Sequence, residues 1–362
     1  MQTNSANDSY PYNDDLLRTP ADQQHARDTY GTIAFALIFP ALVECHDRAD
    51  AVANGEKRRI RRRGLASVAL VTCAILLASL APYIPEGLRE LPYAPHAIGL
   101  LSALLGIAGG VIALRNSTTT WLEHRLVTEG LRQFHFCMLI RLAPDLLLAA
   151  RSGDHAEFER KRKIEFEGFC RNLIARKASV LASLTREREV SKELRIDPSP
   201  ASKALADANG AILLKAYRDL RILRQCQYAD HKLADDTRLL SRMPRQQLRV
   251  LTALGASCVA LLLSAHIISA LLLGNELDRW VQLAAIWIAI GALALRVIEE
   301  GLKPRAEIER YRHYQSTTYR ILERFDRGDV EARLQAAEQL EQAAFDEMTI
   351  FLRAQKEARF VM

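Results

Sequence analysis

The sequence lacks every motif by which the common enzyme classes are recognised. It contains no glycine-rich phosphate-binding loop, no GxSxG and no HExxH. Acidic residues are abundant, but no pair of them stands at positions that would indicate a general acid and a general base. We therefore predict no catalytic residues and no cofactor, and we expect that the protein is not an enzyme.

Cysteine is sparse, and its six residues form no pattern. They stand at positions 45, 73, 137, 170, 226 and 258, without a CxxC pair or a cluster with histidine. A protein metal centre needs several such ligands close together. The spacing therefore predicts free thiols and no metal site.

The amino-terminal stretch lacks the basic and apolar regions of a signal peptide. Residues 1–25 are polar, rich in Asn, Asp and Gln, and this composition predicts a disordered tail. Nowhere in the chain do apolar and polar residues alternate over enough positions to predict a strand. The expected fold class is therefore all-α.

Long apolar runs are the feature that the sequence does have. They occupy residues 65–84, 97–114, 250–273 and 281–298. About 20 apolar residues are enough to cross the hydrocarbon core of a bilayer. Short links join the first run to the second and the third to the fourth. We therefore predict an all-α membrane protein with two transmembrane helical hairpins, four spans in all, and long cytoplasmic helices.

Basic residues flank the spans on one side. Residues 57–63 include six Lys and Arg before the first span, and Arg242, Arg245 and Arg249 precede the third. The link of each hairpin carries one net negative charge. The positive-inside rule then places both termini and the central region in the cytoplasm, as in a multi-pass protein of the bacterial inner membrane. We expect the basic runs to contact membrane lipids and not nucleic acid.

A proline-containing stretch marks the expected domain boundary. Residues 197–200 read Asp-Pro-Ser-Pro, which cannot continue a helix. We expect a linker at 197–202 between a first hairpin with its cytoplasmic helices, 26–196, and a second, 203–362. Both halves run in one order: polar helix, hairpin, charged helix, Gly-Asp turn and charged helix. The order indicates a degenerate internal duplication, with coincidence as the alternative.

Small residues recur every four positions on the second and third spans. Such faces let helices approach closely in a bilayer. They predict packing within a hairpin, and oligomeric packing around a pore is the alternative. The residues are Ser102, Gly106 and Gly110 on the second span, and Ala256, Ala260 and Ser264 on the third.

His266 lies inside the third span, where an ionisable group is costly unless it is neutral or faces protein or water. Two interpretations stand side by side. The histidine is either neutral and hydrogen-bonded to a neighbouring helix, or it lines a pore.

The charged helices outside the spans carry side chains at three- and four-residue spacing, which predicts contacts between helices. The apolar stripe of the last helix is suited to a partner helix. The residues concerned are Trp121, Arg125 and Glu129 after the second span, Tyr228 and Lys232 before the third, and Leu340 and Phe351 in the last helix.

Three short patterns resemble those of a known family. They are Gln227 to Lys232 before the third span, Trp121 with Arg125, Glu129, Leu131 and Arg132 after the second, and Leu340-Glu341 with Asp346-Glu347 and Phe351 at the end, where Phe351 replaces the usual tryptophan. In these patterns the chain resembles bacterial two-transmembrane SLATT effector domains, and the related four-transmembrane effectors found beside nucleotide synthetases. Residues 205–362 are the most similar.

The resemblance implies a function and partners but no catalytic residue. It implies a homo-oligomer that forms a pore and damages the host membrane when a cytoplasmic sensor or nucleotide-signal protein responds to phage. The first hypothesis is therefore a membrane-disrupting effector of a bacterial antiphage or conflict system. The alternatives are a non-enzymatic membrane scaffold or assembly protein, whose cytoplasmic helices bind partners, and an ion channel.

Overall fold

The computed structural model describes residues 14–83, 93–115, 117–186, 201–234, 243–271 and 276–357. Every regular element among them is helical, without a strand. Four helices are long and apolar enough to cross a bilayer, so the chain is an all-α membrane protein, as predicted.

The chain folds as two units, and each is assembled from separate stretches of sequence. We call the first the helical unit and the second the membrane unit. The helical unit comprises Met1–Asn54, Thr119–Leu233 and Glu309–Gln355, and the membrane unit comprises Gly55–Thr118, Ala234–Ile308 and Lys356–Met362.

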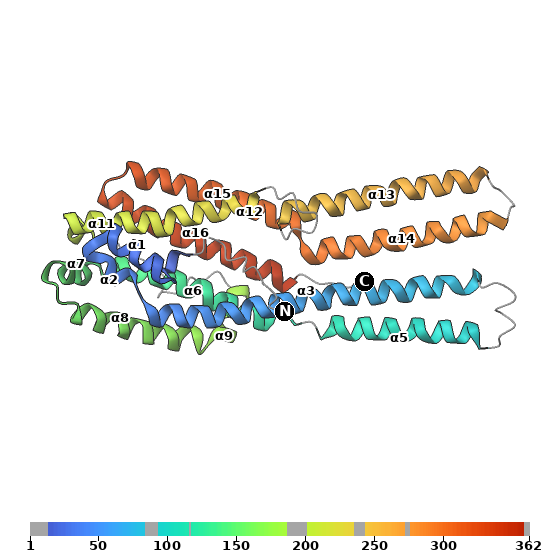
Figure 1. The fold of residues 1–362 in the computed structure, drawn as a ribbon, viewed down its shortest axis with the longest axis horizontal. Helices are drawn as coiled ribbons and strands as arrows, with labels where there is room; N and C mark the ends of the chain where they lie inside the picture. Colours follow the sequence, from blue (N-terminus) through green and yellow to red (C-terminus); the bar gives the residue numbers. More distant parts are fainter. Residues whose placement is uncertain are drawn as a thin grey trace. The chain divides into compact units, whose positions relative to one another are not determined.

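Most helices of the helical unit are short, and several connect with little or no interruption (Figure 1). Two five-residue π-helical segments, η4 and η6, join longer helices. The elements are η1 (Asp14–Leu16), α1 (Pro20–Tyr30), η2 (Gly31–Ile33), α2 (Ala34–Leu37), the start of α3 (Pro40–Leu80), α6 (Thr119–Arg141), α7 (Ala143–Ser152), α8 (Ala156–Phe169), η4 (Cys170–Ile174), α9 (Lys177–Arg186), α10 (Ala201–Ala204), α11 (Ala208–Tyr217), η6 (Arg218–Ile222), α12 (Leu223–Leu233), α15 (Pro304–Arg327) and α16 (Val330–Glu357).

The division into two hairpin domains at 197–202 is corrected by the structure, because the helical unit draws on both halves of the sequence. Most of that expected linker lies outside the described residues. The amphipathic helices beside the spans bury their apolar faces against helices from the other half. The Phe136 ring, for example, packs on Tyr217, and the Gln133 amide donates to the Glu341 carbonyl oxygen.

The expectation of a disordered tail is also corrected for residues 14–25. α1 begins with a capping box, in which the Thr19 hydroxyl accepts from the Asp22 amide at 3.1 Å and the Asp22 carboxylate accepts from the Thr19 amide at 3.2 Å. Pro20 at the first helical position suits the helix start. Leu16 and Leu17 are buried and hold the segment in place. Residues 1–13 lie outside the described residues.

α6 supplies most of the centre of the helical unit. Sixteen residues between Trp121 and Ile140 are buried, and those from Gly130 to Ile140 form an unbroken run. This part of the helix is therefore enclosed on all sides. Its aromatic residues pack on neighbouring helices. The Phe134 ring lies 4.6 Å from that of Phe169 on α8, and the Phe136 ring meets Tyr217 edge to face at 5.8 Å.

The membrane unit contains the two hairpins, formed by the end of α3 with η3 (Ala81–Tyr83) and α5 (Ala94–Leu114), and by α13 (Pro244–Leu271) and α14 (Glu276–Leu302) (Figure 1). Large apolar side chains such as Leu104, Ile107, Leu261 and Ile267 are exposed on these helices. Exposed apolar surface of this kind suits a lipid environment. The links, 84–92 and 272–275, lie outside the described residues.

Candidate functional site

A buried ion pair joins η6 to α16 in the helical unit. Arg221 and Glu341 are 1% and 3% exposed. The Arg221 guanidinium donates to both carboxylate oxygens of Glu341, at 2.8 and 2.6 Å, and the Tyr217 hydroxyl donates to one of them at 2.8 Å. This forked geometry is the strongest arrangement available to an Arg–carboxylate pair.

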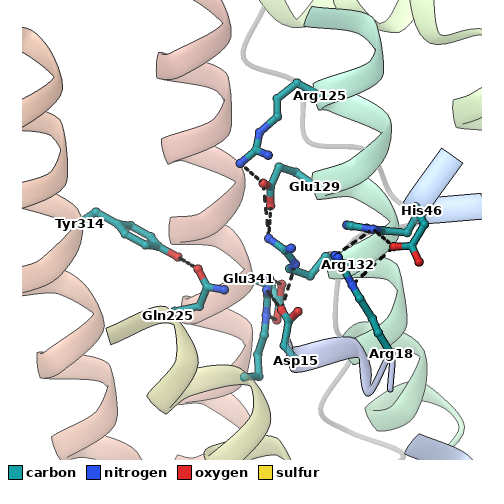
Figure 2. A network of polar contacts seen from close by, with 11 residues as sticks. Asp15, Arg18, His46, Arg125, Glu129, Arg132, Gln225, Tyr314 and Glu341 are labelled. Atoms are coloured by element: carbon teal, nitrogen blue, oxygen red, sulfur yellow. Dashed lines mark hydrogen bonds and ion pairs between the residues drawn. The ribbon is translucent and has the colours of Figure 1, made fainter. Parts of the chain in front are cut away.

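Asp15 connects this pair to α6. Its Oδ2 atom lies 2.9 Å from Nε of Arg132 and 3.8 Å from Nη1 of Arg221. Arg132 also pairs with Glu129 at 3.2 Å, and Glu129 pairs with Arg125 one turn earlier on the helix. Figure 2 shows these charges as one continuous network.

A second branch reaches α3. The buried His46 contacts Arg18 at 3.2 Å and Asp47 at 3.3 Å through its Nδ1 atom, and Asp47 pairs with Arg18 at 3.5 Å (Figure 2). Burial lowers the pKa of His46. The hydrogen bond to Asp47 raises this pKa, and the positive charge of the nearby Arg132 lowers it further. Both branches thus tie the residues after position 13 to helices far away in the sequence.

The charges of the network hold one another ionised. Burial alone would raise the pKa of Glu129, but Arg125 and Arg132 outweigh it and lower that pKa to about 2. Burial alone would also lower the pKa of Arg221, yet the carboxylate of Glu341 raises it well above its usual range. Among the described residues, no carboxylate pairs with the neighbouring His135. Burial, with Arg162 and Arg221 nearby, lowers its pKa to about 3.

An aromatic rim lies beside the network and contains most of the contact residues predicted on the charged helices outside the spans. The Tyr228 and Tyr311 rings meet edge to face at 6.0 Å, and Lys232 lies over the Tyr228 ring at 5.4 Å. The Trp121 and Phe351 rings meet at 5.7 Å. Arg310 lies over the rings of both Tyr311 and Phe351, at 4.7 and 4.8 Å, and Leu340 is completely buried.

Sequence reasoning missed the residues at the centre of the network. Asp15 was placed in the expected tail, and Arg221 and Glu341 were not selected as an ion pair. The partners are 120 positions apart, so no helical spacing connects them. The one available signal was the Arg125, Glu129 and Arg132 spacing on a single face, which the structure places in the same network.

The small residues of the second span lie partly between the helices of the first hairpin. The Ser102 hydroxyl donates to the Ala74 carbonyl oxygen at 2.7 Å, and Gly106 lies against Ala74. Gly110 contacts nothing within 4 Å of the place of a Cβ atom. The closest approach is instead at Gly109, where a Cβ atom would stand 2.7 Å from Val71.

The small residues of the third span lie differently. Ala256, Ala260 and Ser264 are all exposed on α13, and the Ser264 hydroxyl donates to the Ala260 carbonyl oxygen of its own helix. The small residue of α13 that is buried is Ala265. His266 is exposed as well, so the described part of the membrane unit does not enclose it.

An open groove of about 530 Å³ lies elsewhere in the helical unit, between residues 27–38 and α7 and α8. The Phe35 and His155 rings stack at 3.7 Å in its wall. Arg162, also in the wall, donates to the Ile38 carbonyl oxygen at 3.2 Å and pairs with Glu159. The groove is therefore lined by both aromatic and charged groups.

Among the described residues, no group of His, Cys, Asp and Glu is placed to hold a metal ion. The six cysteines are free thiols. No protein-family model matches the chain, and neither a curated protein nor a solved structure is significantly similar to it.

Proposed function

We propose that this protein is a membrane-embedded effector, which disrupts the bilayer as a homo-oligomer in a bacterial antiphage or conflict system. The observation that supports this most is the exposed small-residue face of α13, formed by Ala256, Ala260 and Ser264. In the first hairpin, by contrast, Ser102 and Gly106 are used for packing inside the chain. A small-residue face without an internal partner is suited to a helix of a second copy.

The position of His266 adds to this argument. Its side chain is exposed on the membrane-spanning helix α13. An imidazole that faces lipid is costly, whereas one that faces another subunit or a water-filled path is not. Assembly of several copies would remove His266 from lipid, and this favours a pore over a monomeric anchor.

The proposed orientation places both termini and the helical unit in the cytoplasm of a bacterium, with the spans in the inner membrane. There the helical unit would meet the sensor or nucleotide-signal protein that the SLATT resemblance implies. Reporter fusions after Gly87 and Asn275, in the two links, should then give an external signal. Fusions after Ser199 and at the carboxyl end should give a cytoplasmic one. A cytoplasmic signal from either link would overturn this orientation.

Induced expression in bacteria, followed with a membrane-potential dye, tests the effector proposal. We expect depolarisation with the wild-type chain and a weaker response with Ala260→Leu, because a bulky side chain would separate two small-residue faces. Leu261→Ala trims an exposed residue beside that face and is the matched control. An unchanged potential on induction of the wild-type chain together with its genomic neighbours would contradict the proposal.

A membrane scaffold or assembly protein is the second candidate, and the open groove of the helical unit favours it. In that case the spans are anchors, and induction leaves the membrane potential unchanged while partners co-purify with the chain. An ion channel, the third candidate, rests on His266 alone. Reconstituted liposomes would then leak ions in a pH-dependent way that His266→Leu abolishes.

A further inference from the structure

The first described residues lie at the centre of the ion network. Asp15, Leu16 and Leu17 are 1%, 1% and 4% exposed, although they precede the first long helix. We call residues 14–18 the strap. Through Asp15 the strap places one carboxylate beside the guanidinium groups of Arg132 and Arg221, which are themselves 5% and 1% exposed.

The strap fits this place imperfectly. The Oδ1 atom of Asp15 is buried and has no hydrogen-bond partner among the described residues, whereas Arg221 bonds both oxygens of Glu341. A buried oxygen without a partner weakens the contact that buries it. Leu17 also has a φ angle of +49°, in the left-handed region that side chains disfavour. Both features weaken the attachment of the strap to the network.

The place that Asp15 occupies needs a negative charge. Without that carboxylate, Glu129 and Glu341 would remain, but Glu129 is shared with Arg125. The guanidinium groups of Arg132 and Arg221 would then lie buried with too little negative charge beside them. Buried charges in that condition are strongly unfavourable, so the vacated place would attract an anion from solution.

We propose that Arg132 and Arg221 form an oxyanion-binding site, which Asp15 fills in this conformation as a tethered ligand. A carboxylate or phosphate from outside the chain replaces Asp15 and releases the strap from the helical unit. Such an anion shifts the equilibrium because it binds only where Asp15 has left. The site does not depend on what the spans do to the bilayer, so it stands or falls separately from the effector function.

Chemical rescue of the full-length protein in detergent tests the site. Asp15→Ala vacates the place of the carboxylate, whereas Asp15→Asn fills it with a neutral amide. We expect each to lower the Tm by roughly 5–10 °C, as for other broken buried ion pairs. Sodium formate or sodium phosphate should restore at least about half of that loss in Asp15→Ala and little in Asp15→Asn, relative to sodium chloride at equal ionic strength.

The site would be overturned if the Tm of both variants recovered equally, or if the Tm of Asp15→Ala recovered as much in sodium chloride as in formate or phosphate. Rescue by formate alone indicates an acidic side chain as the natural ligand, and rescue by phosphate alone indicates a phosphate group; both support the site. Glu323→Ala, which removes a carboxylate from an exposed pair with Arg327 outside the network, is the control and should show no specific rescue.

Hydrogen exchange of the wild-type protein tests release and needs no variant. The amides of α1, which follow the strap directly, should exchange faster in phosphate than in chloride at equal ionic strength. Amides of α8, which lie in the same unit, should not change. Release would be overturned if the amides of α1 exchanged at an unchanged rate at phosphate concentrations that rescue Asp15→Ala. If that variant fails to fold, an unchanged rate at phosphate concentrations that saturate any effect on the Tm of the wild type would overturn it.

Discussion

The helical unit has a group of charged side chains at the centre of its packing, and the first hairpin of the membrane unit has two serine side chains where its helices meet. Arg221 and Glu341 are almost completely buried and neutralise each other with a forked pair of hydrogen bonds. The membrane unit has no comparable pair among its described residues. There, the hydroxyls of Ser67 and Ser102 donate to carbonyl oxygens of the opposite helix.

The two hairpins of the membrane unit differ in the same respect. In the first hairpin, hydroxyls and glycines lie between α3 and α5. In the second, the exposed Ser257 and Ser264 donate to carbonyl oxygens of their own helix, and the Ser269 hydroxyl near the end of α13 donates to the Asp278 carboxylate of α14. The small-residue face of the first hairpin is therefore used for internal packing. The second keeps its small-residue face available for other contacts, which is why we assign oligomer formation to α13.

Removal of one partner from the buried pair should have the largest effect. Glu341→Gln leaves the guanidinium of Arg221 without its forked partner, and we expect a loss of about 3–5 kcal/mol in the free energy of unfolding. Thermal or denaturant unfolding in detergent measures it. Glu323→Gln, in an exposed pair with Arg327, should cost less than about 1 kcal/mol. A similar loss for both variants would mean that the buried network contributes nothing special.

Acid should weaken the helical unit through His135. The pKa of His135 is lowered from 6.5 to about 3 by burial, so the unfolded chain binds a proton below pH 6.5 that the folded chain refuses until about pH 3. Stability should therefore fall by about 2 kcal/mol between pH 7 and pH 5. His135→Leu should flatten this decline, and the exposed His25→Leu should not.

At still lower pH a second group contributes to the same decline. The pKa of Glu129 is lowered from 4.5 to about 2, so its stabilising effect is complete above pH 4.5 and is lost as the pH falls towards 2. Unfolding curves of His135→Leu should therefore still decline below about pH 4.5 through Glu129, and the lowered pKa of His46 should leave a remaining decline below pH 6.5. A decline of the wild type that begins only below about pH 4.5 would contradict the role given to His135.

Gly109 and Gly110 offer a neighbouring pair that tests the contact within the first hairpin. A Cβ atom at Gly109 would stand 2.7 Å from Val71, and one at Gly110 would meet nothing within 4 Å. We expect Gly109→Ala to destabilise the hairpin by about 1–3 kcal/mol, as overpacking does. Gly110→Ala should be neutral or slightly stabilising. Thermal unfolding and crosslinking between α3 and α5 would measure both, and equal behaviour would disprove the close approach.

The smallest effect should separate the serines of the two hairpins. Ser102→Ala removes a hydrogen bond between helices and should cost about 0.6 kcal/mol. Ser264→Ala removes a bond within one helix and should leave the unfolding of the monomer unchanged. Thermal unfolding at low protein concentration, where oligomers dissociate, makes the comparison. A larger effect at Ser264 would mean that the small-residue face of α13 has a partner within the chain.

Much of the fold could be predicted from short-range patterns. The spans follow from apolar runs, and the contacts of Tyr228 with Lys232 and of Arg125 with Glu129 follow from four-residue spacing. The division into domains did not follow, because helices from both halves of the sequence pack together. The helix α1 was also not predicted, because the polar composition of residues 1–25 indicated disorder and the capping box of Thr19 and Asp22 was not recognised.

The sequence alone determined that four helices are long and apolar enough to cross a membrane, because an apolar run of that length has few other stable arrangements. It also determined that the charged segments beside the spans are helical where the structure describes them. Tertiary structure alone decided that Asp15, Arg221 and Glu341 meet in one buried network, and that Gly109 rather than Gly110 lies against α3. A charged residue looks the same in a sequence whether it faces water or a partner more than a hundred positions away, and only the packing of helices distinguishes the two.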